Sequence, residues 1–88
     1  MTTTYTETAG TLTNTTVAVA ANENRRELII SNNSDTAMTY RPSGTASAAA
    51  GIAIAAGTAL RFLDGAAPTT AGTVFCAGTS KAYSIYER

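Results

Sequence analysis

Short strand-like segments recur about every ten residues along this chain, and that spacing constrains the fold more than any other feature of the sequence. The segments carry β-branched or aromatic residues, and clusters of Gly, Pro, Asn, Asp and Ser separate them. No window carries apolar residues at the spacing of an amphipathic helix. We predict strands over residues 3–8, 15–20, 26–32, 36–41, 52–55, 58–63, 73–77 and 81–87.

These segments predict an all-β fold, a small antiparallel β-sandwich or barrel of seven to eight short strands. The strands pair antiparallel because the connections are too short for crossover helices. We expect residues 1–14 to form an extended N-terminal arm or edge strand, and residues 15–88 to form a single β-sandwich domain. Segment 26–32 is apolar on both faces, which is typical of a central strand covered on each side. The turn-forming run at 32–35 predicts that residues 26–41 form a hairpin.

The core of such a domain is expected to be thin. Apolar residues make up 44% of the 88 residues, but eighteen residues are Ala, which contributes little burial. In a chain this short, the energy of burial and the cost of ordering nearly cancel, and disulfides, metals or oligomerisation usually supply the remainder. Cys76 is the only cysteine, there is no His, and the acidic residues are scattered, so neither a disulfide nor a metal site is expected. We therefore expect a homo-oligomer.

The charge balance argues against several classes of partner. Six basic and six acidic residues give a net charge of zero, and the adjacent pair Arg25 and Arg26 is flanked by Glu23 and Glu27. Nucleic-acid binders carry a basic stripe, and membrane-docking surfaces carry a strong field, so we expect neither activity. The N-terminal residues lack the features of a secretion signal, and no apolar run is long enough to span a bilayer. We expect a soluble protein made in the cytoplasm.

Residue patterns that support catalysis are also missing. A Ser or Cys nucleophile needs a base, most often His. Lys81 opens a strand after a turn and is expected to be solvated, and Glu23 and Glu27 only flank a turn. Cys76 lies in an apolar strand, where an unpaired thiol is usually an inert core residue. The sequence predicts no catalytic, cofactor-binding or metal site, and no enzyme.

Three further patterns leave alternatives open. An arginine at 25 or 26 is expected to brace turn carbonyls of its own fold, and the alternative is bidentate binding of a partner carboxylate. The alternating Thr residues at 2–8 fit an ice-binding surface, but no repeat continues past Thr16. Five aromatic residues either form a sugar-binding platform or fill the core, and the core is favoured: Tyr40, Tyr83, Tyr86, Phe62 and Phe75.

A pattern of turns and apolar positions extends over roughly residues 15–63. It reads Asn22-x-Asn24-Arg25-x-x-Leu28-x-Ile30-x-Asn32-Asn33-Ser34, followed by Tyr40, Gly44 and Gly51-Ile52-x-Ile54-x-x-Gly57. This pattern resembles small virion proteins of tailed phages and prophages, of the capsid decoration (cement) or head-fibre kind. The resemblance implies a compact β-domain on the capsid surface, commonly a homotrimer and made in the host cytoplasm, with an arginine at 25 or 26 anchoring the first hairpin.

We therefore expect a non-enzymatic structural virion protein that binds the exterior of a phage-type capsid and stabilises it. Its partner would be the major capsid protein or another virion protein. The alternative is a tail- or baseplate-associated adaptor, or a receptor- or carbohydrate-binding module. The N-terminal residues 2–8 are expected to add a strand to the sheet of a neighbouring subunit. The candidate partner-binding residues are Thr4, Tyr5, Thr6, Arg25 and Arg26.

Overall fold

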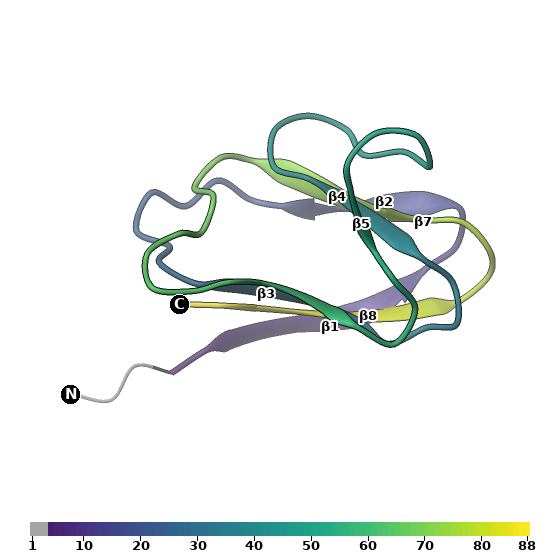
Figure 1. Ribbon diagram of the computed structural model, residues 1–88, viewed down its shortest axis with the longest axis horizontal. Coiled ribbons are helices and arrows are strands. Elements are labelled where there is room, and N and C mark those ends of the chain that lie inside the picture. The colour runs from purple at the N-terminus through teal and green to yellow at the C-terminus, as the bar shows by residue number, and fades with distance from the viewer. Residues whose placement is uncertain (1–3) are drawn as a thin grey trace.

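The computed structural model describes residues 4–88 as two four-stranded antiparallel sheets that pack face to face (Figure 1). The described residues form no helix, and hence none long and apolar enough to cross a membrane. The predicted all-β fold is confirmed, and the two separate sheets make it a sandwich. The strands are β1 (Thr6–Leu12), β2 (Thr15–Val19), β3 (Leu28–Asn32), β4 (Met38–Arg41), β5 (Ile52–Ile54), β6 (Ala59–Phe62), β7 (Gly72–Cys76) and β8 (Lys81–Glu87).

The strand order shows how the chain is laid out. One sheet has the order β1-β8-β3-β6 and the other β2-β7-β4-β5. Strand β1 pairs with β8, β2 with β7, β3 with β6 and β4 with β5, all antiparallel, as in one long hairpin whose tip is the loop at 42–51. Folding this hairpin over itself brings β3 beside β8 and β4 beside β7. The result is the strand order of a jelly roll, a two-sheet architecture built from Greek keys.

The predicted hairpin over residues 26–41 is wrong, because β3 and β4 lie in different sheets. The turn residues carry the chain from one sheet to the other. The side chain of Asn32 holds this arch: its Nδ2 donates to the carbonyl oxygens of Thr36 at 2.8 Å and Ile54 at 3.0 Å, and its Oδ1 accepts from the backbone N–H of Ser34 at 3.1 Å. Asn32 is itself buried, so these bonds replace the water that its amide loses.

Strand β3 has the central position that its sequence predicts, between β8 and β6. The cover predicted on both of its faces is not observed. Leu28 and Ile30 are fully buried between the sheets, whereas Ile29 and Ser31 are only half-buried on the outer face. The outer face of this sheet therefore has no second layer within the described residues.

The core lies between the inner faces of the two sheets, to which each strand contributes alternate residues. Strands β4 and β8 contribute Met38, Tyr40, Tyr83 and Ile85, and all four side chains are buried. Val17, Leu60 and Phe62 pack against the cluster from its margins. The buried cluster consists of Leu12, Val19, Leu28, Ile30, Met38, Tyr40, Ile54, Ala67, Val74, Cys76, Tyr83 and Ile85.

Strand β1 belongs to the sandwich and lies at the edge of its sheet. The predicted segment begins at Thr3, outside the described residues, and ends at residue 8, whereas β1 pairs with β8 as far as Leu12, a core residue. Gly10 lies within β1, and its lack of a side chain makes room for the ring of Tyr83. A Cβ at Gly10 would lie 3.1 Å from the Tyr83 Oη.

Candidate functional site

Arg25 is the most heavily bonded charged residue that the structure describes. Its side chain is fully buried and forms an ion pair with the Glu87 carboxylate, with 2.8 Å between Nη1 and Oε2. The guanidinium also donates to the backbone carbonyl oxygens of Pro68 at 2.9 Å, Ala20 at 3.0 Å and Thr70 at 3.3 Å. The planar guanidinium can satisfy several acceptors at once. Arg25 thus ties the loops at 20–27 and 63–71 to β8.

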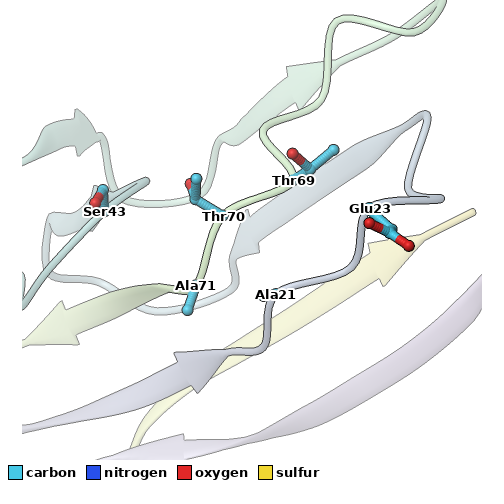
Figure 2. A pocket seen from close by; sticks show the side chains of 6 residues that line it. All are labelled: Ala21, Glu23, Ser43, Thr69, Thr70 and Ala71. Carbon is cyan, nitrogen blue, oxygen red and sulfur yellow. The ribbon is translucent and has the colours of Figure 1, made fainter.

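An open hollow lies above these loops (Figure 2). Its lining consists of small side chains and one carboxylate, from Ala21, Glu23, Ser43, Thr69, Thr70 and Ala71. In Figure 2 the Glu23 carboxylate lies at one end and the Ser43 hydroxyl at the other, with the two Thr residues between them. The Thr70 hydroxyl donates to the Pro42 carbonyl oxygen at 2.5 Å. The hollow offers polar groups for contact, and no pair among them is arranged as a nucleophile with its base.

A second polar cluster forms where the N-terminal segment meets the last residue. The Tyr5 hydroxyl donates to the Glu27 Oε1 at 2.6 Å, and the Arg88 Nε donates to the same oxygen at 2.5 Å. The other carboxylate oxygen accepts from the backbone N–H of Asp64 at 3.2 Å. The Arg88 guanidinium also stacks on the Tyr5 ring, 4.4 Å from its centroid, in a cation–π contact.

These contacts shift the ionisation of the groups involved. The hydrogen bond from Tyr5, followed by those from Arg88 and the Asp64 N–H, lowers the pKa of Glu27 from 4.5 to about 2. The same hydrogen bond raises the pKa of Tyr5, because the hydroxyl proton is held by a carboxylate. Glu27 therefore stays ionised down to strongly acidic pH and works as a fixed anion that joins the two termini of the described chain.

The predicted partner-binding residues do not gather into one site. Thr4 and Thr6 are exposed, and Tyr5 is half-buried with its hydroxyl bonded to Glu27. Arg25 is buried and bonded internally, whereas the next residue, Arg26, is exposed and its backbone N–H donates to the Arg88 carbonyl oxygen at 2.7 Å. The expected bracing of loop carbonyls is therefore made by Arg25.

Sequence reasoning missed the roles of Glu27 and Arg88. One signal for Glu27 was present: a carboxylate inside a predicted central strand needs a partner, because an unpaired buried charge is costly. No local pattern announces Arg88, since its ion pair spans 61 positions of sequence separation.

The other candidate groups lie where they support the fold. Lys81 forms an ion pair with Asp35 at 2.6 Å, and this contact lowers the pKa of Asp35. Cys76 is buried, and burial raises the pKa of its thiol. Tyr40 and Tyr83 are core residues, and Phe62 packs against the core, edge-on to Tyr40. The expected core position is wrong for Phe75 and Tyr86, which are half-buried and lie outside the core cluster. Among residues 4–88, no group of three or more potential metal ligands is present.

Comparison with known proteins adds no assignment to this geometry. No family model, no curated protein and no solved structure matches the chain. The contacts described above and the pattern at residues 15–63 are therefore the observations that bear on function.

Proposed function

We propose that this chain is a non-enzymatic structural virion protein that binds the exterior of a phage-type capsid as a homotrimer and stabilises it. The major capsid protein is the proposed partner. The observation that carries the proposal is where the charged side chains bond. Those with the shortest polar contacts bond to other parts of the same chain and hold the fold together. A structural subunit needs such bracing, whereas a catalyst needs reactive groups that face a substrate.

The Arg25 cluster is the main example. A buried arginine with several donors is a common component of anion-binding and catalytic sites. Here its donors reach three loop carbonyl oxygens and the Glu87 carboxylate, so the guanidinium faces no open cavity. Glu27 is likewise bonded to Tyr5, Arg88 and the Asp64 backbone. Both clusters fix loops and termini, which suits a small domain that must stay folded on a particle surface.

The strand order gives a second line of support. Jelly rolls occur in viral capsid proteins and in lectins, among other proteins. This is an argument by analogy of fold, because one architecture hosts many functions. It agrees with the virion proposal and also with the carbohydrate-binding alternative, so the experiment must separate the two.

Capsid stabilisation can be tested directly. Purified chain is added to heads of the phage or prophage that encodes it, stripped of this protein, and the melting temperature of the heads is followed by differential scanning fluorimetry. We expect a saturable rise in melting temperature and co-sedimentation of the chain with the heads. Heads that already carry the protein serve as the control and should show no further rise. Absence of both binding and stabilisation would refute the decoration role.

The hydroxyl-lined hollow in Figure 2 favours one second candidate, a carbohydrate-binding tail or receptor module. Screening the chain on an array of bacterial surface glycans tests it. Glycan binding that Glu23→Gln weakens, together with no effect on capsid melting, would replace the decoration proposal with this one.

A further inference from the structure

The sandwich has two flanks, each with one edge strand from each sheet. Strands β1 and β6 are the edges of one sheet, and β2 and β5 are the edges of the other. A connection of only Thr13 and Asn14 joins β1 to β2, so these two edges lie on the same flank. We call this side, formed by Thr6–Leu12 and Thr15–Val19, the β1–β2 flank, and the opposite side the β5–β6 flank.

The two flanks differ in how their edges are protected against pairing. An exposed edge strand presents unpaired N–H and C=O groups, and proteins usually guard it by shortness, charge or proline. On the β5–β6 flank, β5 has only three residues and β6 carries Arg61 within four residues. On the β1–β2 flank, β1 has seven residues and β2 has five, and neither contains proline, lysine or arginine. The β1–β2 flank is therefore the unguarded side.

The single charge of the β1–β2 flank strands does not protect the edge. Glu7 is the only charged residue in β1 or β2, and its carboxylate accepts a hydrogen bond from the Tyr86 hydroxyl at 2.8 Å. Tyr86 lies directly opposite Glu7 on β8, so the carboxylate is held toward the middle of the sheet. A strand that approaches the free edge of β1 meets small, uncharged residues instead, which are Thr, Ala and Gly.

A groove runs between β1 and β2 on this flank. Val19 and Ile85 line it together with Thr8, Ala18, Ala20 and Glu87. Thr8 and Gly10 lie opposite the inward-facing Ile85 and Tyr83 on β8, and both are exposed. The flank therefore combines two free backbone edges with a shallow seam of small side chains.

We propose that β1 of one copy pairs with β2 of the next copy, in a closed ring of identical chains. The two strands run in opposite directions, as their arrows in Figure 1 show. A rotation axis parallel to the strands therefore brings β1 of one copy antiparallel to β2 of its neighbour, the arrangement that a ladder of hydrogen bonds requires. Each joint extends one sheet into the sheet of the next chain and covers the groove.

The occupant is a second copy because the flank supplies both halves of the joint. A foreign strand would pair with one edge and leave the other open, whereas each copy in a ring uses β1 and β2 together. The facing strands also bring no like charges together, since β2 is uncharged and Glu7 is bonded to Tyr86. This pairing gives the homotrimer of the proposed function its interface, and it rests on that proposal only for the number of copies.

The test places a charge on each half of the joint. Thr8→Lys and Ala18→Lys put lysines at exposed positions of β1 and β2, so a single chain can accept both without loss of its fold. Thr45→Lys, in the exposed loop at 42–51, is the matched control. Mass is measured by light scattering after size exclusion over a concentration series, and folding is checked by circular dichroism. We expect an oligomer for the unaltered chain and for Thr45→Lys, and a folded monomer for the double variant.

Amide hydrogen exchange gives a second measurement. In the oligomer, the amides of β1 and β2 that point away from β8 and β7 should be protected, and the double variant should lose that protection while β3 amides stay protected. A monomeric unaltered chain, or an oligomer that survives in the double variant, would overturn the pairing. Capsid stabilisation by such a monomer would leave the decoration role intact, and a ring that does not bind heads would refute the decoration role alone.

Discussion

Two ion pairs join the same two segments of this chain, residues 25–27 just before β3 and residues 87–88 at the end of β8. They differ in where they face. Arg25 meets Glu87 with a fully buried guanidinium, whereas Arg88 meets Glu27 with 35% of its side chain exposed. Each segment contributes the cation to one pair and the anion to the other, so the two pairs form opposite sides of one clasp.

The difference between the pairs lies in what replaces water. The Arg25 guanidinium has lost its hydration and depends on the carbonyl oxygens of three loop residues. Arg88 keeps access to solvent, and its pair depends instead on the Tyr5 hydroxyl, which shares the same Glu27 oxygen. Removal of one partner from a buried pair leaves the other groups buried without a bonding partner, which is costly. An exposed pair contributes less, because water and salt screen it. The inner pair should therefore dominate stability at neutral pH.

The largest effect is expected at Arg25. Arg25→Met removes the guanidinium and leaves Glu87 and three loop carbonyl oxygens without this donor. We expect the free energy of unfolding to fall by about 3–5 kcal/mol, the usual result of breaking a buried pair. Urea unfolding followed by circular dichroism measures the change.

The neighbouring arginine supplies a matched control. Arg26 is exposed, and Arg26→Met should change the free energy of unfolding by no more than about 0.5 kcal/mol. Equal losses in the two variants would contradict the distinction between a buried brace and a surface charge. The same comparison decides which arginine of the pair anchors the fold.

The sequence predicts the strands well because alternation and turn chemistry are local. In the predicted strand 36–41, Met38 and Tyr40 alternate with Thr39, and the structure buries both side chains. Which strands pair is harder to predict from the sequence, because a turn at 32–35 can return the chain within one sheet or carry it across to the other sheet. That choice depends on the hydrogen bond from Asn32 to Ile54, 22 positions away.

The candidate clusters show the same limit. The bracing role of an arginine at 25 or 26 follows from the sequence, but the choice between the two depends on burial against the loop at 63–71. The pairing of Glu27 with Arg88 joins residues that share no local pattern. Contacts that close a fold between distant segments are set by the topology, and one sequence read along its length does not reveal them.

A smaller effect of opposite sign is expected at Tyr40. This residue is fully buried, and its hydroxyl has no hydrogen-bond partner among the described residues. Burial raises its pKa, and the charge of Arg25 acts in the opposite direction. An unsatisfied buried hydroxyl costs about 1–3 kcal/mol, so Tyr40→Phe should raise the free energy of unfolding by about 1 kcal/mol. A clear loss of stability in urea unfolding would show that the hydroxyl is bonded in solution.

The smallest effect concerns the outer pair, and it is read from the pH dependence of stability. The pKa of Glu27 is lowered in the folded chain from 4.5 to about 2. Because the folded state binds this proton more weakly than the unfolded state, the stability that Glu27 contributes is complete above pH 4.5 and is lost as the pH falls towards 2. Tyr5→Phe removes the largest cause of the shift, so it should raise the pKa of Glu27 and move acid unfolding to higher pH.

Tyr86→Phe is the matched control for this prediction. Tyr86 packs edge-on against Tyr5 at 6.5 Å between ring centroids, but its hydroxyl donates to Glu7 and not to Glu27. A carboxyl NMR titration should therefore show a raised pKa for Glu27 in Tyr5→Phe and an unchanged one in Tyr86→Phe. An unchanged pKa of Glu27 in Tyr5→Phe, or an equal shift in Tyr86→Phe, would contradict the assignment of the shift to the Tyr5 hydroxyl. The ionisation of Glu27 would then depend on its other two donors, the Arg88 guanidinium and the Asp64 backbone N–H.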